Sequence, residues 1–205
     1  MGLFTEQQLL LRAQAEVGTT RTFSDTPYTR AKASINEARK IQLSAAETKI
    51  YDIFLSHSTT DSEQVLGLKL TLEDLGYSVY VDWIDDPQLD RSNVTKKTAD
   101  ILRERMKSCK SLFYAYSINA VNSKWMPWEL GYFDGIKQKA AVLPIRASNY
   151  QNTDSYYGSE YLGLYYYIVI NPDLQNQNKL WVHETSTKYI MYEGWIKYNL
   201  EPLQR

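Results

Sequence analysis

Apolar residues from about residue 49 onward fall into two kinds of pattern. Five short runs, rich in β-branched and aromatic residues, have the length of buried strands. Longer stretches between them repeat apolar residues every three or four positions, which is typical of helices that cover a sheet. Because strands alternate with helices, the pattern predicts a parallel sheet with helices on both faces. The predicted strands cover residues 50–55, 77–82, 111–116, 140–145 and 165–170, and the predicted helices cover 62–75, 94–107, 124–139 and 185–200.

Residues 1–48 have a different texture and contain few large apolar side chains after Leu11. Leu3, Phe4 and residues 9–11 predict a short amphipathic helix, and a stripe of Ala and Ile predicts a second helix over 29–48. So few apolar residues do not make a core of their own. We therefore expect a helical N-terminal extension over 1–48 and one α/β domain over 49–205.

Composition and charge exclude several functional classes. A net charge of -1 and a pI near 6.2 argue against nucleic acid as a partner. No run of about 18 apolar residues is present, so we expect no membrane span. The chain starts without the hydrophobic stretch of a secretion signal and has one cysteine, so we expect a cytoplasmic protein. The sequence has neither a Cys/His cluster for zinc nor a G-x-G-x-x-G loop for a redox nucleotide.

The segment 123–136, SKWMPWELGYFDGI, carries the strongest chemical signal. It places Glu129 one helical turn after Trp125, beyond a predicted strand, near the sheet edge where parallel sheets bind ligands. An indole beside one carboxylate suits a flat cationic ligand, or a sugar on which positive charge develops. The structural alternative is that the tryptophans anchor the core and Glu129 favours the positive end of the helix dipole.

Three motifs, in order, resemble the Toll/interleukin-1 receptor (TIR) domain family. YDIFLSHSTTD at 51–61 resembles the opening strand and loop of these domains, and GYSVYVD at 76–82 resembles their second strand with its terminal Asp. SKWMPWEL at 123–130 is similar to the Ser-x-Trp-x-x-x-Glu-Leu signature of the NAD-cleaving members. Each motif alone is weak, but their order and spacing together make a strong signal. The resemblance covers about residues 49–200.

This resemblance implies a flavodoxin-like sheet of five parallel strands and an NAD nucleosidase or ADP-ribosyl cyclase. Such an enzyme cleaves the bond between nicotinamide and ribose, and Glu129 matches the catalytic acid by position. NAD is then a substrate, and we expect no cofactor and no metal. Thoeris-like bacterial members, which this chain resembles, imply antiphage defence, self-association through TIR–TIR contacts, and a separate effector protein that responds to the nucleotide product.

A single carboxylate is enough for this reaction. Nicotinamide leaves a cationic pyridinium as a neutral molecule, so no proton donor is needed, unlike in most glycosidases. The enzyme mainly has to stabilise positive charge on the ribose. Two other classes stay open: a non-catalytic TIR adaptor that acts by assembly, and an enzyme like nucleoside 2-deoxyribosyltransferases, which share the sheet and a catalytic Glu. The residues favour neither water nor an internal hydroxyl as the acceptor.

Further candidate contacts follow the first two strands. Ser56, His57 and Ser58 lie in a strand–helix loop, where backbone N–H groups can meet a diphosphate. A purely structural histidine is the alternative for His57. Asp82 ends the second strand. It is a candidate ligand contact, and the alternative is that it fixes the loop by a hydrogen bond. Trp83 is a candidate for stacking on adenine.

The loop over 85–92 departs from the family pattern because it has no glycine, which leaves the assembly geometry and the product open. Within it, Arg91 is a candidate phosphate ligand, with an ion pair to Asp86 or Asp90 as the alternative. Trp125 is a candidate for stacking on nicotinamide or ribose.

Three other polar or aromatic residues are expected to be structural. Asp61 is placed to cap the following helix. Trp128 points about 100° away from Glu129 on a helix, so we expect it in the core. His183 is distant in sequence from the other candidates.

Overall fold

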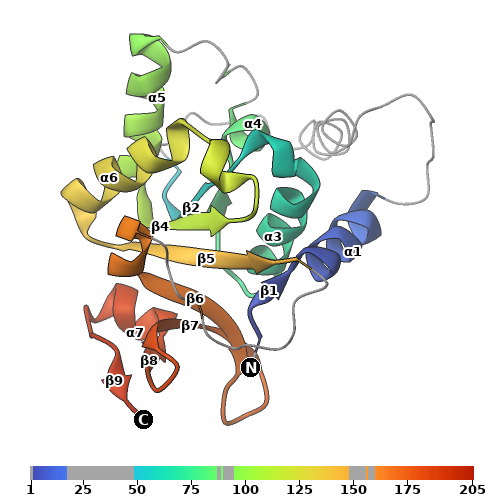
Figure 1. Ribbon diagram of the computed structural model, residues 1–205, viewed down its shortest axis with the longest axis vertical. Helices are drawn as coiled ribbons and strands as arrows, with labels where there is room; N and C mark the ends of the chain where they lie inside the picture. Colours follow the sequence, from blue (N-terminus) through green and yellow to red (C-terminus); the bar gives the residue numbers. More distant parts are fainter. Residues whose placement is uncertain (1, 18–48, 87–88, 90–94, 148–155, 157–159) are drawn as a thin grey trace.

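The computed structural model describes residues 2–17, 49–86, 89, 95–147, 156 and 160–205 (Figure 1). The predicted helix over 29–48 and the candidate Arg91 lie outside these residues. Among the described helices, none is long and apolar enough to cross a membrane.

The centre of the fold is a sheet of five parallel strands, as predicted. Its strand order, β3-β2-β4-β5-β6, is that of a flavodoxin-like sheet. The strands lie within two residues of the predicted runs at every end, although β3 is short. They are β2 (Tyr51–Ser56), β3 (Val79–Tyr80), β4 (Cys109–Tyr116), β5 (Ala140–Arg146) and β6 (Tyr166–Pro172).

Helices cover both faces of this sheet because successive strand residues point to opposite sides. On β2, Ile53 and Leu55 join a buried cluster with α1 and α3, whereas Phe54 joins a second cluster with α5 and α6. The two hydrophobic cores therefore lie one on each side of the sheet. The helices between the strands are α3 (Ser62–Asp74), α4 (Asp82–Asp85), α5 (Lys96–Lys107) and α6 (Trp125–Lys137), with short 3-10 turns η1 (Thr59–Asp61), η2 (Ala120–Asn122) and η3 (Glu160–Leu164).

The described N-terminal residues are built into the same core. Strand β1 (Phe4–Thr5) pairs in parallel with β5, and α1 (Glu6–Val17) packs beside α3 (Figure 1). The backbones approach so closely that a Cβ on Gly67 would lie 1.9 Å from the carbonyl oxygen of Leu9. The predicted short helix is thus present, although it begins after Phe4. The domain boundary at residue 48 stays a prediction.

An antiparallel extension follows the parallel strands. It consists of β7 (Asn178–Thr185), β8 (Lys188–Met191), α7 (Tyr192–Lys197) and β9 (Leu203–Gln204), and Figure 1 shows it beside β6 in orange to red. The predicted helix over 185–200 is therefore wrong except at 192–197. Leu180, Val182 and Ile190 all face the core, so the true period before residue 192 is two, with a hairpin turn at 186–187.

Candidate active site

Glu129 lies at the carboxyl edge of the parallel sheet, in the first turns of α6, and has no exposed surface. Ser56, the last residue of β2, donates a hydrogen bond from its Oγ to Glu129 Oε2 at 2.6 Å. Ser56 is also fully buried. A charge-assisted hydrogen bond of this kind fixes the rotamer of the carboxylate. The sheet and α6 thus hold one acid at the edge where ligands bind in such folds.

The start of α6 follows from its sequence. Ser123 Oγ accepts a hydrogen bond from the backbone N–H of Met126 at 3.3 Å, which satisfies one of the unpaired donors of the first turn. Pro127 is tolerated there because first-turn N–H groups have no partner inside the helix. Met126 and Leu130 are buried against the sheet, so the helix presents Glu129 toward β2.

The loop after β2 and the segment after β3 are joined through His57. Its Nδ1 lies 2.8 Å from the carbonyl oxygen of Leu55, and its Nε2 accepts a hydrogen bond from Trp83 Nε1 at 3.0 Å. Asp82 Oδ1 lies 3.4 Å from the same Nε2 and accepts from the backbone N–H of Trp83. These bonds place the proton of a neutral imidazole on Nδ1. His57 therefore acts as a bridge inside the protein.

This arrangement disfavours two of the expected ligand contacts, which stay untested. Trp83 is 5% exposed and lies in the core, so it has no open face for the predicted stacking on adenine. Both nitrogens of His57 face protein atoms, which argues against a direct contact with ribose or phosphate. Asp82 makes the loop-fixing hydrogen bond that was the alternative for it.

Asp61 ties the first loop to the loop after β4. It stands at the N-cap position of α3, but the predicted cap is not formed by its side chain. Its carboxylate instead accepts hydrogen bonds from Ser117 Oγ and from Asn119 Nδ2. Ser58 is buried and shares a hydrogen bond with Thr60, within the same loop. The sequence indicated this contact only indirectly, because Asp61 and Ser117 each follow a strand at the same sheet edge.

Comparison with known proteins identifies the fold. The family model described as TIR domain matches residues 53–179, more than half of the chain. The chain belongs to the TIR-domain family.

Two curated proteins are similar to this TIR chain. "Probable 3' cyclic ADP-D-ribose synthase ThsB'" from Bacillus cereus (strain MSX-D12) is 51% identical over 200 residues, which cover 97% of this chain and 100% of that protein. "Putative cyclic ADP-D-ribose synthase TIR2" from Cytobacillus dafuensis is 33% identical over 85 residues, which cover 41% of this chain and 22% of that protein.

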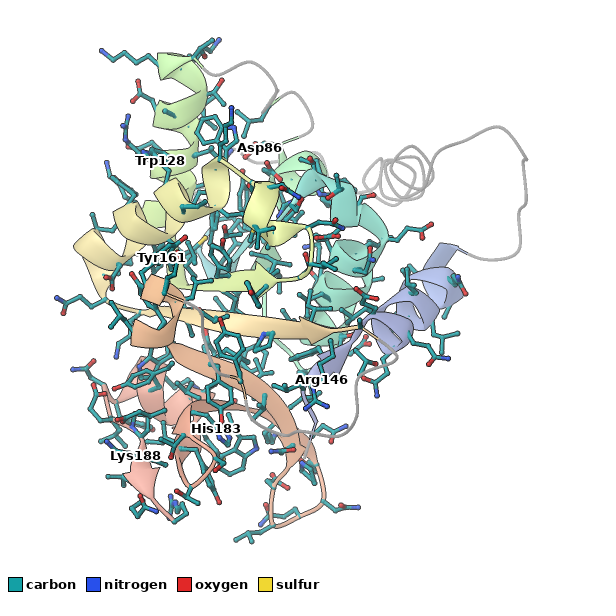
Figure 2. All side chains as sticks on the ribbon, viewed as in Figure 1. Asp86, Trp128, Arg146, Tyr161, His183 and Lys188 are labelled. Atoms are coloured by element: carbon teal, nitrogen blue, oxygen red, sulfur yellow. The ribbon has the colours of Figure 1, made fainter. Side chains whose placement is uncertain are left out.

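Beside Glu129, the TIR site has an aromatic row along α6. Trp125 and Trp128 meet edge to face at 5.4 Å, and Trp128 stacks on Tyr132 at 5.9 Å. The guanidinium of Arg103, on α5, lies 5.3 Å from the centre of the Trp128 ring. Both tryptophans are only half-buried, so Trp128 is less of a core residue than predicted. Figure 2 shows Trp128 where α6 meets α5.

Asp86, which precedes Arg91 in the sequence, is held by side chains of α5 and β3. Arg105 donates two hydrogen bonds to Asp86, at 2.6 and 2.9 Å, and Tyr80 donates a third at 2.8 Å. Burial, with the charge of Asp86, raises the pKa of Tyr80, and the hydrogen bond to Asp86 raises the pKa of Arg105. Asp86 therefore pairs with Arg105 on α5, a partner that was not predicted from the sequence. Whether Arg91 binds phosphate stays a prediction.

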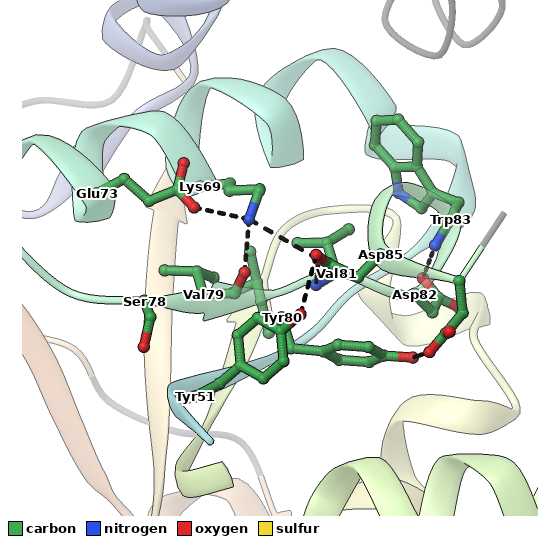
Figure 3. A network of polar contacts seen from close by, with 12 residues as sticks. Tyr51, Lys69, Glu73, Ser78, Val79, Tyr80, Val81, Asp82, Trp83 and Asp85 are labelled. Carbon is green, nitrogen blue, oxygen red and sulfur yellow. Dashed lines mark hydrogen bonds and ion pairs between the residues drawn. The ribbon is translucent and has the colours of Figure 1, made fainter. Parts of the chain in front are cut away.

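A second polar network supports the segment after β3 (Figure 3). Lys69 of α3 donates to Glu73 at 2.7 Å and to the carbonyl oxygen of Val79, and lies 3.7 Å from Asp85. Asp85 in turn accepts from Tyr51 at 3.2 Å and from the backbone N–H of Val81 at 2.8 Å. A buried lysine with several partners is structural. Sequence reasoning placed Lys69 only in a helix.

Proposed function

We propose that this protein cleaves the nicotinamide–ribose bond of NAD and closes the remaining molecule into cyclic ADP-ribose. The observation that carries this proposal is the position of Glu129, buried at the sheet edge and held by Ser56. It is supported by the identity of 51%, over nearly the whole of both chains, to a protein named as a probable 3' cyclic ADP-D-ribose synthase. Catalysis by the chain itself explains this buried acid better than an adaptor role does.

Glu129 has one main task in this reaction. The electron pair of the C–N bond leaves with nicotinamide, which becomes neutral, and positive charge develops on the ribose carbon. A carboxylate close to that carbon stabilises the charge, and it does so more strongly away from water. Ser56 holds one oxygen of Glu129 by a 2.6 Å hydrogen bond, so the acid is oriented before substrate arrives.

The burial of Glu129 favours ring closure over hydrolysis. If water captures the ribosyl cation, the product is ADP-ribose. If a hydroxyl of the same NAD molecule attacks instead, it forms a C–O bond, loses its proton and gives a cyclic product. We propose that the site closes around bound NAD as fully as it covers Glu129 and Ser56 here, so few water molecules compete with the internal hydroxyl. The same burial requires that groups covering Glu129 move before NAD can bind.

The other candidates receive different roles. Trp125 is half-buried one helical turn before Glu129, and we propose that it stacks on nicotinamide or ribose. His57, Asp82 and Trp83 act as positioning residues, because they fix the loops around Ser56 and bury their polar atoms against each other.

We propose antiphage defence as the setting, with the cyclic product acting on a separate effector protein. We also propose that activity depends on self-association, since TIR enzymes generally complete their site across a domain contact. Specific activity should then rise with protein concentration, in step with assembly measured by light scattering. Constant specific activity from a monomer at all concentrations would contradict the dependence on assembly.

One incubation tests the activity. Purified protein is mixed with NAD in water enriched in oxygen-18, and nicotinamide and the nucleotide product are followed by chromatography and mass spectrometry. We expect free nicotinamide and a product 18 mass units below ADP-ribose, with no heavy oxygen. Heavy ADP-ribose would support NAD cleavage but contradict cyclisation. No nicotinamide at any protein concentration would favour the adaptor, and base exchange on nucleosides would favour the deoxyribosyltransferase class.

Ser56→Ala tests how Glu129 is held. The variant removes the hydrogen bond to Oε2, and we expect kcat to fall about tenfold while KM changes less, since the loss concerns orientation. Thr60→Ala, in the next turn, is the control because it leaves Glu129 untouched. A large rise in KM with unchanged kcat would instead assign Ser56 to substrate binding.

A further inference from the structure

A row of contacting rings crosses one face of β6, β7 and β8. Tyr167, His183 and Tyr189 lie opposite one another on β6, β7 and β8. The ring centres of His183 and Tyr167 are 5.2 Å apart, and those of His183 and Tyr189 are 4.7 Å apart with planes 17° from parallel. Neighbouring residues such as Val182 point the other way and pack with α7, so this aromatic face is the one that α7 does not cover.

A cavity of about 330 Å³ opens on this face, near the β6–β7 hairpin. This volume is at the small end of the range for ligand pockets, and it suits a single bicyclic ring. Trp181 forms a wall edge-on to Tyr189, with ring centres 5.6 Å apart, and its Nε1 already donates to the carbonyl oxygen of Asn171. The lining residues are Asn171, Pro172, Asp173, Leu174, Trp181, His183 and Tyr189.

The charge of the lining restricts what the cavity accepts. Among these seven residues, all of them in the described part of the chain, none is a lysine or an arginine. The one full negative charge belongs to Asp173, whose carboxylate accepts hydrogen bonds from the backbone of Gln175 and Gln177. A phosphate or carboxylate has no positive partner here and would be repelled by Asp173. Anions, including NAD and other nucleotides, are therefore poor ligands for this cavity.

His183 supplies the polar feature of the pocket. It is 3% exposed, and its Nδ1 lies 3.1 Å from the carbonyl oxygen of Thr185, so Nδ1 carries the proton. Its other nitrogen, Nε2, is covered from water and has no hydrogen-bond partner among the described residues. An acceptor left unpaired in this way is costly, and a donor that reaches it regains a bond that water does not supply. Figure 2 places His183 in the extension, away from Trp128 of α6.

We propose that this cavity binds a small, uncharged, planar aromatic molecule with one N–H donor, at a site separate from the NAD-cleaving centre. The flat walls of Trp181 and Tyr189 hold the ring. The side chains that cover Nε2 of His183 shift when the ligand binds, and the ligand N–H then donates to this nitrogen. Exclusion of anions makes this site chemically distinct from the catalytic one. Leu174, which is fully exposed at the hairpin tip, covers the outer side of the ligand.

The probe is indole, with 1-methylindole as its matched control, because the two differ in the donor and one methyl group. Ligand-observed NMR titration of the full chain should show saturable binding of indole, with 1-methylindole at least about tenfold weaker. Benzoate, a flat anion, should not bind. Equal binding of indole and 1-methylindole, or no saturable binding of indole, would overturn the proposal.

Three variants locate the site without risk to the fold. Leu174→Ala should weaken indole by about threefold, whereas Leu203→Ala, an equally simple change at an exposed leucine outside the cavity, should leave it unchanged. Glu129→Gln should also bind indole normally, since the two sites are separate. Loss of binding in Glu129→Gln, or identical binding in both leucine variants, would contradict the location.

The nitrogen-15 signal of His183 gives a direct readout. With histidine labelled in both ring nitrogens, the chain has only His57 and His183 to resolve. Indole should shift the Nε2 resonance of His183 toward a hydrogen-bonded value and leave that of His57 in place, because His57 already accepts from Trp83. A titration that moves neither Nε2 resonance would overturn the role of His183.

Discussion

The parallel half of the sheet and its antiparallel extension each contain a buried histidine, and the two histidines differ in the hydrogen-bond partners of their ring nitrogens. His57, at the edge of the parallel half, has a protein partner at each ring nitrogen. His183, in the extension, has one at Nδ1, and its Nε2 has none among the described residues. His57 therefore fixes two loops relative to each other. His183 keeps one unpaired acceptor nitrogen, to which we propose that a ligand donates.

The same contrast extends to the residues around each histidine. Polar side chains of the parallel half bond to one another: Asp61 accepts from Ser117, Asp86 accepts from Arg105, and Glu129 accepts from Ser56. The extension is held by strand pairing and by stacked rings such as His183 and Tyr189. Rigidity at the first region suits catalysis, which depends on small distances.

The largest effect should come from Gly67→Ala, which attacks the packing of the parallel half. The new methyl group would meet the backbone of Leu9, so α1 must move away from α3, and we expect a loss of at least about 3 kcal/mol in unfolding free energy. Gly131→Ala, in α6, is the matched control because nothing lies near its added Cβ, and it should stabilise by up to about 1 kcal/mol. Chemical denaturation measures both, and equal stabilities would show that α1 does not pack as described.

The same substitution at both histidines tests the contrast itself. His57→Phe leaves the N–H of Trp83 and the carbonyl of Leu55 without partners in the core, which should cost about 2–4 kcal/mol. His183→Phe removes one hydrogen bond but also an unpaired nitrogen, and Thr185 is exposed to water, so the change should stay within about 1 kcal/mol. If urea unfolding showed a larger loss of unfolding free energy for His183→Phe than for His57→Phe, the contrast between the two histidines would be contradicted.

The smallest effect concerns pH. Burial lowers the pKa of His183 below its ordinary value of 6.5, so the unfolded chain takes up a proton more readily than the folded one. Stability should therefore be complete above that value and fall as pH drops through about 6.5, until the folded-state pKa is passed. On lowering the pH, the unfolding free energy of wild type should fall further than that of His183→Phe, by about 1 kcal/mol or less. An identical pH dependence in the two proteins would mean that His183 titrates as freely as in the unfolded chain.

The sequence predicted the parallel half well because its strands have clear ends. The runs that become β2, β4 and β5 are buried on both faces, so they are continuous and apolar. The extension was harder, because Leu180 and Val182 alternate with Trp181 and His183, and these large side chains blurred the period of two, so no strand was predicted there. The helix predicted over 185–200 included β8, whose four residues are too few to show a period.

The candidate site shows the same limit. Glu129 and Ser56 were found from short motifs, and the structure brings them within hydrogen-bond distance. The partners of Asp61 and Asp86 were not found, because Ser117 and Arg105 are distant in sequence and only the strand order brings them near. A close contact between loops depends on tertiary packing, which no local pattern encodes.

The most direct test of the proposed activity compares nicotinamide release from NAD by wild type, Glu129→Gln and Asp134→Asn. Both variants replace an acid of α6 by its amide, but Asp134 is only partly buried and accepts from Tyr165. We expect Glu129→Gln to lose at least about 100-fold in kcat with an unchanged melting curve, because charge stabilisation of the transition state is removed while the shape is kept. Asp134→Asn should remain within about twofold of wild type. Full activity in a folded Glu129→Gln protein would contradict the assignment of Glu129 as the catalytic acid.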